Sequence, residues 1–73
     1  MKLTNFISGL QVLQKYYTID PDFSVTYDGD FLAEPTNHLV SDEDVKLLKL
    51  YGWLQEGSHK SDPYDPKFGW LAY

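Results

Sequence analysis

The stretch Ser41–Trp53, SDEDVKLLKLYGW, contains the start, body and end of one helix and the first residue of the next segment. Ser41 is a favourable N-cap, and Asp44 follows three residues later, as the acid of a capping box does. Residues 42–44 are all acidic and fall in the first turn, where they complement the positive end of the helix dipole. Gly52 suits the left-handed position just past a helix end. The stretch therefore predicts a helix that starts after Ser41 and ends before Gly52.

A second helix is predicted near the N-terminus, where apolar residues recur at spacings of three and four. Thr4 or Asn5 could cap its start, and Asp20-Pro21 ends it because a residue before proline is disfavoured in helical geometry. Gly9 lies inside this helix, where glycine costs about 1 kcal/mol relative to alanine. The periodic positions are Phe6, Ile7, Leu10, Val12, Leu13, Tyr16 and Tyr17.

Residues 23–33 have the pattern of a β-hairpin. FSVTY at 23–27 alternates between apolar and polar residues, Asp28-Gly29-Asp30 is typical of a turn, and FLA follows. A two-residue Asp-Gly turn would mix the two faces of the hairpin. A three-residue loop that pairs Tyr27 with Phe31 gives one apolar face, and we predict this register.

Two further apolar runs near the C-terminus, GWLQEG and KFGWLAY, could pair as a second hairpin around a polar loop at residues 58–66. The predicted element order is α-β-β-α-β-β. This order indicates an α+β fold in one compact domain over residues 1–73, an antiparallel sheet with two helices on one face. The predicted core consists of Phe6, Leu10, Leu13, Val25, Phe31, Leu47, Leu48, Tyr51, Trp53 and Trp70.

Charge narrows the classes of partner. The chain carries 11 acids against 6 basic residues, all of them lysine, and has a formal net charge of −5. Arginine is the preferred residue for phosphate and guanine contacts, and a negative protein is repelled by nucleic acid and by anionic lipid. The composition therefore argues against nucleic-acid and membrane partners and favours a protein with a basic or mixed surface. The alternative is that the charge only keeps a small protein soluble.

Residue types also argue against an enzyme. The chain has no cysteine and 2 histidines, so a thiolate nucleophile and a zinc site of ordinary composition are absent. Ser58 and His59 are chain neighbours with no triad spacing, and there is no glycine-rich phosphate loop. We expect neither a cofactor nor a metal. No run approaches the ~20 apolar residues of a membrane span, and the N-terminus lacks a signal-peptide pattern, which together suggest a cytoplasmic protein.

Two acidic clusters outside the helix cap are candidates for binding. Asp28 and Asp30 flank a glycine, which is typical of a hairpin turn and lacks the remaining ligands of a calcium loop. In DPYDP, two Asp-Pro steps favour extended or turn geometry around Tyr64, leaving Asp62 and Asp65 exposed. Tyr64 is either an exposed anchor for a partner or a structural residue that folds back over the hairpin. The predicted partner-binding residues are Asp28, Asp30, Asp62, Tyr64 and Asp65.

Three pieces of the chain resemble a group of small acidic proteins of phages and mobile elements. They are the opening helix FISGLQVLQKYY at 6–17, the acidic helix start ending in Gly-Trp at 41–53, and the closing YDPKFGWLAY at 64–73. The resemblance implies a compact α+β domain of mobile-element origin. The group has no settled activity, so no binding or catalytic residue follows from the resemblance.

The leading functional hypothesis is a protein-interaction module without enzymatic activity. A narrower version is an acidic decoy from a phage or mobile element that inhibits a host nucleic-acid enzyme, with carboxylates in place of phosphates. One alternative is a regulator that binds a small ligand or metal through the loop at 58–66. Another is a homodimer or larger homo-oligomer formed through an exposed strand edge, such as that of the C-terminal strand.

Overall fold

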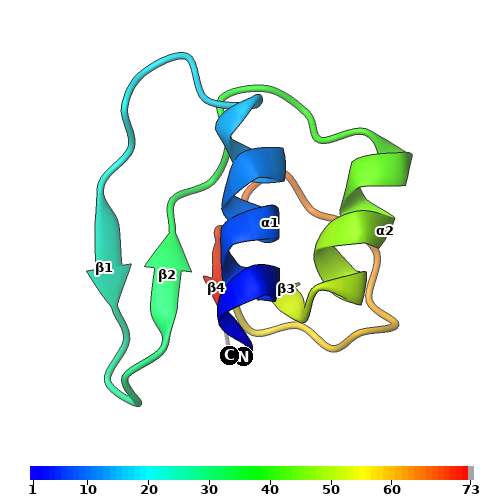
Figure 1. Ribbon diagram of the computed structural model, residues 1–73. Coiled ribbons are helices and arrows are strands. Elements are labelled where there is room, and N and C mark those ends of the chain that lie inside the picture. The colour runs from blue at the N-terminus through cyan, green and yellow to red at the C-terminus, as the bar shows by residue number, and fades with distance from the viewer. Residues whose placement is uncertain (73) are drawn as a thin grey trace.

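The computed structural model describes residues 1–72 and contains two helices and four strands. The chain order is α-β-β-α-β-β, as predicted, and Figure 1 shows both helices in front of one sheet. The elements are α1 (Leu3–Gln14), β1 (Phe23–Val25), β2 (Phe31–Ala33), α2 (Asp42–Leu50), β3 (Trp53–Gln55) and β4 (Trp70–Ala72).

The sheet is antiparallel throughout, with the strand order β1-β2-β4-β3. The last strand therefore lies inside the sheet, between the first hairpin and β3. Ala33 of β2 pairs with Trp70, and Trp53 of β3 pairs with Ala72. The α+β class and the second hairpin, β3–β4, are both confirmed.

The start of α2 follows the predicted cap. Ser41 Oγ accepts a hydrogen bond from the Asp44 N–H at 3.2 Å, and the three acids occupy the first turn. At the other end, Gly52 has a φ of 91°, a left-handed conformation that glycine adopts without steric cost. Trp53 follows it and is fully buried. This Gly-Trp pair thus ends the helix and places a core residue.

The start of α1 differs from the prediction. Lys2 is the N-cap and makes no side-chain cap hydrogen bond, so Thr4 and Asn5 lie inside the first turn and do not cap it. The helix begins earlier because Lys2 C=O already accepts the Phe6 N–H at 3.0 Å. It ends at Gln14, before the Asp20-Pro21 step that the sequence offered as its limit.

The register of the first hairpin is also different. Val25 pairs with Phe31 and Phe23 with Ala33, whereas the predicted register paired Tyr27 with Phe31. The loop has three residues, but it begins one residue earlier than expected, because Gly29 takes the left-handed conformation with φ of 90°. This is a turn followed by a glycine bulge, a common three-residue hairpin loop. Since the shift is even, Phe23, Val25 and Phe31 still share a face.

The core is centred on two tryptophans. Trp53, Trp70, Leu13 and Leu48 are fully buried, as predicted, and Phe6 lies over Trp53 with ring centroids 5.6 Å apart. Five further buried hydrophobic residues are absent from the predicted core. These are Ala33, Val40, Val45, Leu71 and Ala72.

Three predicted core residues are exposed instead: Val25 by 62%, Phe31 by 47% and Leu47 by 37%. The prediction was wrong at β1 because α1 packs over the middle of the sheet. Its Phe6 contacts Phe31 and Trp53, which leaves β1 beyond the cover of either helix. Leu47 is exposed because the buried face of α2 is narrower than predicted and is limited to Val45 and Leu48.

Candidate functional site: the β1 face and its aspartates

The five predicted binding residues do not form one site. Asp28 and Asp30 lie in the loop between β1 and β2, whereas Asp62, Tyr64 and Asp65 lie in the long loop between β3 and β4. Because β1 and β3 form opposite edges of the sheet, the two groups belong to different sides of the molecule. The structure therefore separates the predicted residues into a hairpin pair and a loop group.

The hairpin pair is held by backbone hydrogen bonds. Thr26 N–H donates to Asp30 C=O at 2.8 Å, and Gly29 N–H donates to Thr26 C=O at 2.9 Å. Asp28 is exposed and Asp30 is partly exposed. Neither carboxylate takes part in an ion pair or a side-chain hydrogen bond with residues 1–72. Both charges are therefore free to act on a partner.

The loop group is anchored by Gln55, a buried polar residue of β3 that the sequence gave no reason to select. Its side-chain amide donates to Asp65 C=O at 2.6 Å and to Phe68 C=O at 3.1 Å. Its side-chain oxygen accepts the Asp65 N–H at 2.8 Å. Gln55 is 3% exposed, so these bonds satisfy a polar group that would otherwise be costly to bury.

Tyr64 folds back onto the core, which is the structural alternative of the two interpretations. Its ring stacks on Trp70 with centroids 6.1 Å apart and an interplanar angle of 16°. Its hydroxyl accepts the Val40 N–H at 3.2 Å. Tyr64 is half-buried, so its side chain is not the exposed anchor that one of the two interpretations expected.

The carboxylates of the loop group serve turns within the loop. Asp62 Oδ2 accepts the His59 N–H at 2.9 Å, and Asp65 Oδ1 accepts the Lys67 N–H at 2.9 Å. Lys49 of α2 also donates to the Asp62 carbonyl at 2.5 Å. Hydrogen bonds of this kind fix the loop and leave few free polar groups for a ligand.

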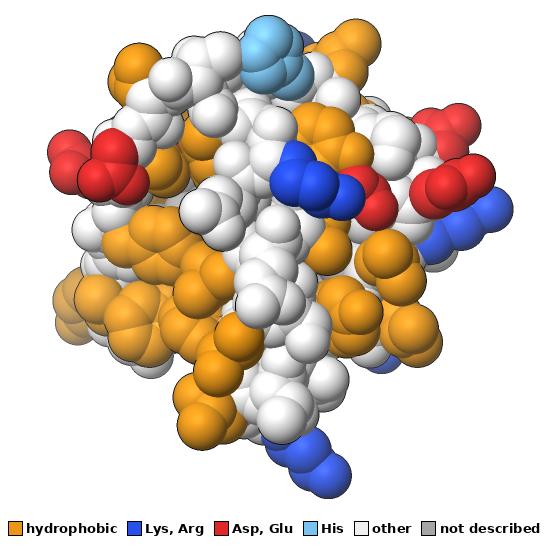
Figure 2. Space-filling view, turned by 45° about the horizontal axis from the view of Figure 1, so that its top comes forward, with side chains coloured by type: hydrophobic (Ala, Val, Ile, Leu, Met, Phe, Trp, Pro, Cys, Tyr) orange, Lys and Arg blue, Asp and Glu red, His pale blue; other side chains and the backbone are white. Residues whose placement is uncertain are grey.

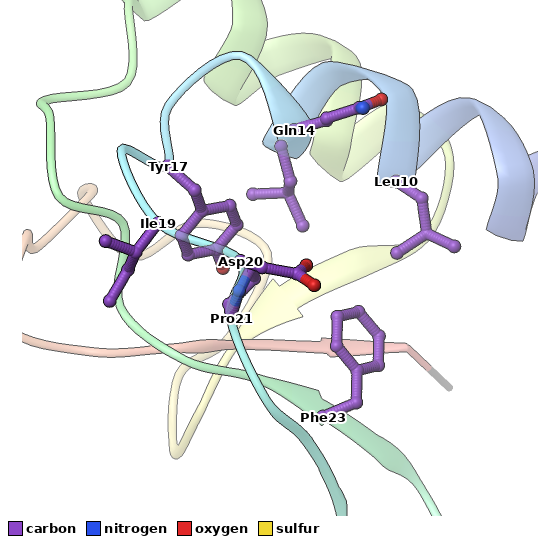
Figure 3. Close-up of a pocket in the computed structure, with 8 residues that line it drawn as sticks. Leu10, Gln14, Tyr17, Ile19, Asp20, Pro21 and Phe23 are labelled. Carbon is purple, nitrogen blue, oxygen red and sulfur yellow. The ribbon is translucent and has the colours of Figure 1, made fainter.

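A groove lined by both apolar and polar side chains, absent from the sequence-based prediction, runs between α1 and β1. It has a volume of about 490 Å³, and the ring of Phe23 points across it toward Leu10 (Figure 3). It is lined by Leu10, Leu13, Gln14, Tyr17, Ile19, Asp20, Pro21 and Phe23. The signal that could have identified this groove was the short length of the first apolar strand. Two helices cannot cover every part of a sheet with so short an edge strand, so part of its apolar face stays open.

Exposed apolar side chains continue around this groove. Ile7 of α1 is 44% exposed, Ile19 is 68% exposed and Phe23 is 40% exposed, together with Val25 and Phe31. We call these five residues and Leu10 the β1 face. Figure 2 shows hydrophobic side chains gathered on the side of the molecule where β1 lies, with acidic side chains at their upper border. Apolar surface of this kind, bordered by charge, marks an interaction site more often than scattered single residues do.

Four of the chain's eleven acids flank β1. Eight of the eleven acids lie between residues 20 and 44, and residues 16–45 contain no lysine. Asp20 and Asp22 precede β1 and are exposed, and Asp28 and Asp30 follow it. In residues 1–72 the ion pairs are Lys15–Asp44 and Lys67–Asp65, so none of these four aspartates is paired.

One acid of the helix cap has a second structural contact. The Asp44 carboxylate accepts hydrogen bonds from the Tyr16 hydroxyl and from Lys15 Nζ, the latter at 2.9 Å. The bond from Tyr16, and then that from Lys15, holds the pKa of Asp44 below its usual value, and the same pairing raises the pKa of Lys15. These contacts tie the end of α1 to the start of α2.

Tyr17 is the other group with a shifted pKa. Burial, and secondly the negative charge of Glu34, raise the pKa of Tyr17 to about 12. Its hydroxyl donates to the Glu34 carbonyl at 2.5 Å, which links the end of α1 to the end of β2. The neutral tyrosine therefore closes one end of the groove and holds the first hairpin against the helix.

The strand edge proposed for self-association is not available. β4 has β2 on one side and β3 on the other, and Leu71 is 7% exposed. The sequence could not reveal this, because a C-terminal strand is as readily placed at an edge as inside a sheet. The free edges of the described sheet belong to β1 and β3.

No group of three or more histidine, cysteine, aspartate or glutamate side chains within residues 1–72 is arranged to hold a metal ion. Neither α1 nor α2, the helices of that same range, has the length and apolar character needed to cross a bilayer. Comparison with protein-family models, with curated proteins and with solved structures finds no match. The function is therefore inferred from the residues and geometry of this chain.

Proposed function

We propose that this protein is a small, acidic, non-enzymatic interaction module that binds a partner protein with a basic or mixed surface. The observation that carries the proposal is the β1 face: exposed apolar side chains, bordered by four unpaired aspartates, in a part of the chain without lysine. Apolar contacts would supply affinity, and the charges would steer and select a basic partner. A cytoplasmic location is part of this proposal.

Of the predicted binding residues, Asp28 and Asp30 receive more support than the loop group. Their carboxylates are unpaired and lie next to exposed apolar surface, whereas Asp62 and Asp65 accept hydrogen bonds within their own loop. The alternative of a small ligand or metal at residues 58–66 has less support for the same reason, since Gln55 and Lys49 already occupy the loop's backbone groups.

The narrower version, an acidic decoy that inhibits a nucleic-acid enzyme, draws support from the row of acids between residues 20 and 30. Origin from a phage or mobile element belongs to this version. However, Phe23 and Val25 are exposed between those acids, which makes the surface mixed in character. A surface that mimics phosphates alone gains nothing from exposed apolar side chains, so we favour a protein surface with apolar side chains of its own.

The test is affinity capture from source-cell lysate at low and moderate salt, with three variants that each change the formal net charge from −5 to −1. Asp28→Lys with Asp30→Lys alters the hairpin, and Asp62→Lys with Asp65→Lys alters the loop. Asp42→Lys with Glu43→Lys is the matched control, since both side chains are exposed in the first turn of α2, which lies on the other side of α1 from β1 (Figure 1).

We expect a stoichiometric partner whose capture weakens with salt and is lost with the hairpin variant, while the loop and control variants retain it. Equal loss in all three variants would show a general charge effect and would contradict a role for the hairpin. If the wild-type protein captures no partner at either salt concentration, the interaction function itself is wrong.

A further inference from the structure

The outer edge of β1 carries unpaired backbone groups. Thr26 and Asp30 form a hydrogen-bonded pair beside the hairpin loop. Since bonded and non-bonded pairs alternate along an antiparallel ladder, Ser24 is bonded to Leu32, while Phe23 and Val25 direct their N–H and C=O groups away from β2. No other hydrogen bond within residues 1–72 involves these outward groups. β1 thus presents donors and acceptors of the kind that an added strand uses.

The side chains of this edge have a defined alternation. Phe23 lines the groove beside α1, Val25 lies on the same face of β1, and Ser24 lies on the opposite face of the sheet. By the same alternation, Asp22 directly before β1 lies on the Ser24 side. A strand laid along this edge would therefore direct every second side chain toward the groove, where Asp20 lies among apolar residues. Its other side chains would lie on the Ser24 side, near Glu34, Glu56 and Lys67.

Charge selects the occupant of this edge. Two copies of the chain joined at β1 would bring Asp20, Asp22, Asp28 and Asp30 of each copy together, and like charges across strands are destabilising. The same aspartates attract lysine and arginine. Exposed edge strands are commonly protected from self-association by short length, charge and proline. β1 has three residues, and Pro21 and Asp22 directly precede it.

We propose that β1 accepts an extended segment of a partner protein as a fifth strand, and that this segment alternates apolar and basic residues. Its apolar side chains occupy the groove between α1 and β1, and its basic side chains lie near the aspartates. The proposal rests on the proposed function and specifies the mode of binding, which is strand addition to an exposed sheet edge.

The first test uses a short synthetic peptide in which lysine and valine alternate, titrated into the isotope-labelled full chain and followed by NMR. We expect the amide signals of Phe23 and Val25 to shift and their hydrogen exchange to slow, because those N–H groups become bonded. The Ser24 amide, already bonded to β2, should keep its exchange rate. A peptide with glutamate in place of lysine and an analogue N-methylated on alternate residues should both fail to bind.

Two variants locate the interaction. Val25→Pro removes an outward N–H without removing a bond to β2, so the sheet should survive while peptide binding is lost. Asp22→Lys with Asp28→Lys should weaken binding about tenfold, since two attractive charges become repulsive. The Asp42→Lys, Glu43→Lys control should bind within about threefold of the wild-type protein.

The proposal is overturned if the basic peptide fails to bind at millimolar concentration, if the N-methylated analogue binds equally well, or if the shifted signals map to α2 or to residues 58–66. Capture of a partner from lysate by the Val25→Pro variant distinguishes this proposal from the proposed function. Retention of a salt-sensitive partner by Val25→Pro would leave the function intact and refute strand addition, and absence of any partner would refute the function.

Discussion

Gly9 is a position at which a single methyl group should change stability strongly. A Cβ built on Gly9 lies 1.9 Å from Nε1 of Trp53 and 2.6 Å from another atom of the same ring. Trp53 is fully buried between Gly9 and the ring of Phe6, and its indole N–H donates to the Asn5 carbonyl at 3.3 Å. The ring therefore has no free direction in which to move.

The expected cost of Gly9→Ala follows from these contacts. Overpacking of a well-packed core costs ~1–3 kcal/mol, and displacement of the indole loses a hydrogen bond of ~1 kcal/mol. Alanine returns ~1 kcal/mol through its higher helix propensity. The net destabilisation is about 2 kcal/mol, which for a domain of this size lowers Tm by roughly 8–16 °C.

The assay is thermal and urea unfolding, followed by circular dichroism and tryptophan fluorescence. Gln11→Ala and Gln11→Gly provide the control, because Gln11 is exposed on the same helix and reports the propensity difference alone. In a Trp53→Phe background the smaller ring should accommodate the new methyl group, so most of the cost of Gly9→Ala should disappear. If Gly9→Ala instead stabilises the wild-type protein by about the propensity difference, the close packing of α1 on Trp53 is wrong.

Three further predictions concern other contacts. Gln55→Leu should destabilise the fold by ~2–4 kcal/mol in urea unfolding, because the Asp65 N–H and C=O lose their partner, and no change would contradict the anchoring of the loop. Tyr64→Phe keeps the stack on Trp70 but leaves the Val40 N–H unsatisfied, so we expect a loss of ~1–2 kcal/mol with partner capture unchanged; loss of capture would restore Tyr64 as a binding residue. Because Asp44 has a lowered pKa in the folded state, its stabilising contribution should be complete above its unfolded pKa of ~3.9 and lost as the pH falls below that value. The stability difference between wild type and Asp44→Asn, measured from pH 6 to pH 2, should therefore shrink toward acid, and a constant difference would refute the assignment.

Local signals in the sequence predicted the order of the elements and both ends of α2, although they misplaced the start of α1 and the register of the first hairpin. Ser41 and Gly52 have chemistry that suits a helix start and a left-handed helix end, and both are used in that way. The burial of Trp53 and Trp70 also follows from their size and from the apolar runs around them. These features depend on a few neighbouring residues, so a linear pattern contains them.

Features that depend on distant residues were not predictable. Val25 and Phe31 were predicted as core residues because alternation reports which side chains share a face and does not report what covers that face. In the sequence Gln55 resembles any other polar residue. Its side chain makes three hydrogen bonds, to Asp65 and Phe68, only because the chain returns to it at those residues. The binding residues were split between two edges of the sheet because strand order is set by packing of the whole chain.

The position of β4 has a consequence for the order in which this protein can fold. Phe31 pairs with Ala72, 41 positions further along the chain, and β4 is the strand that joins the first hairpin to β3. Closing so long a loop costs entropy before any contact offsets it, so the non-local pairing should limit the folding rate. Without residues 70–72, the first hairpin and β3 would not be joined in one sheet, and each would keep an additional exposed strand edge. The nascent chain therefore remains open to proteases and chaperones until residues 70–72 have emerged and closed the sheet.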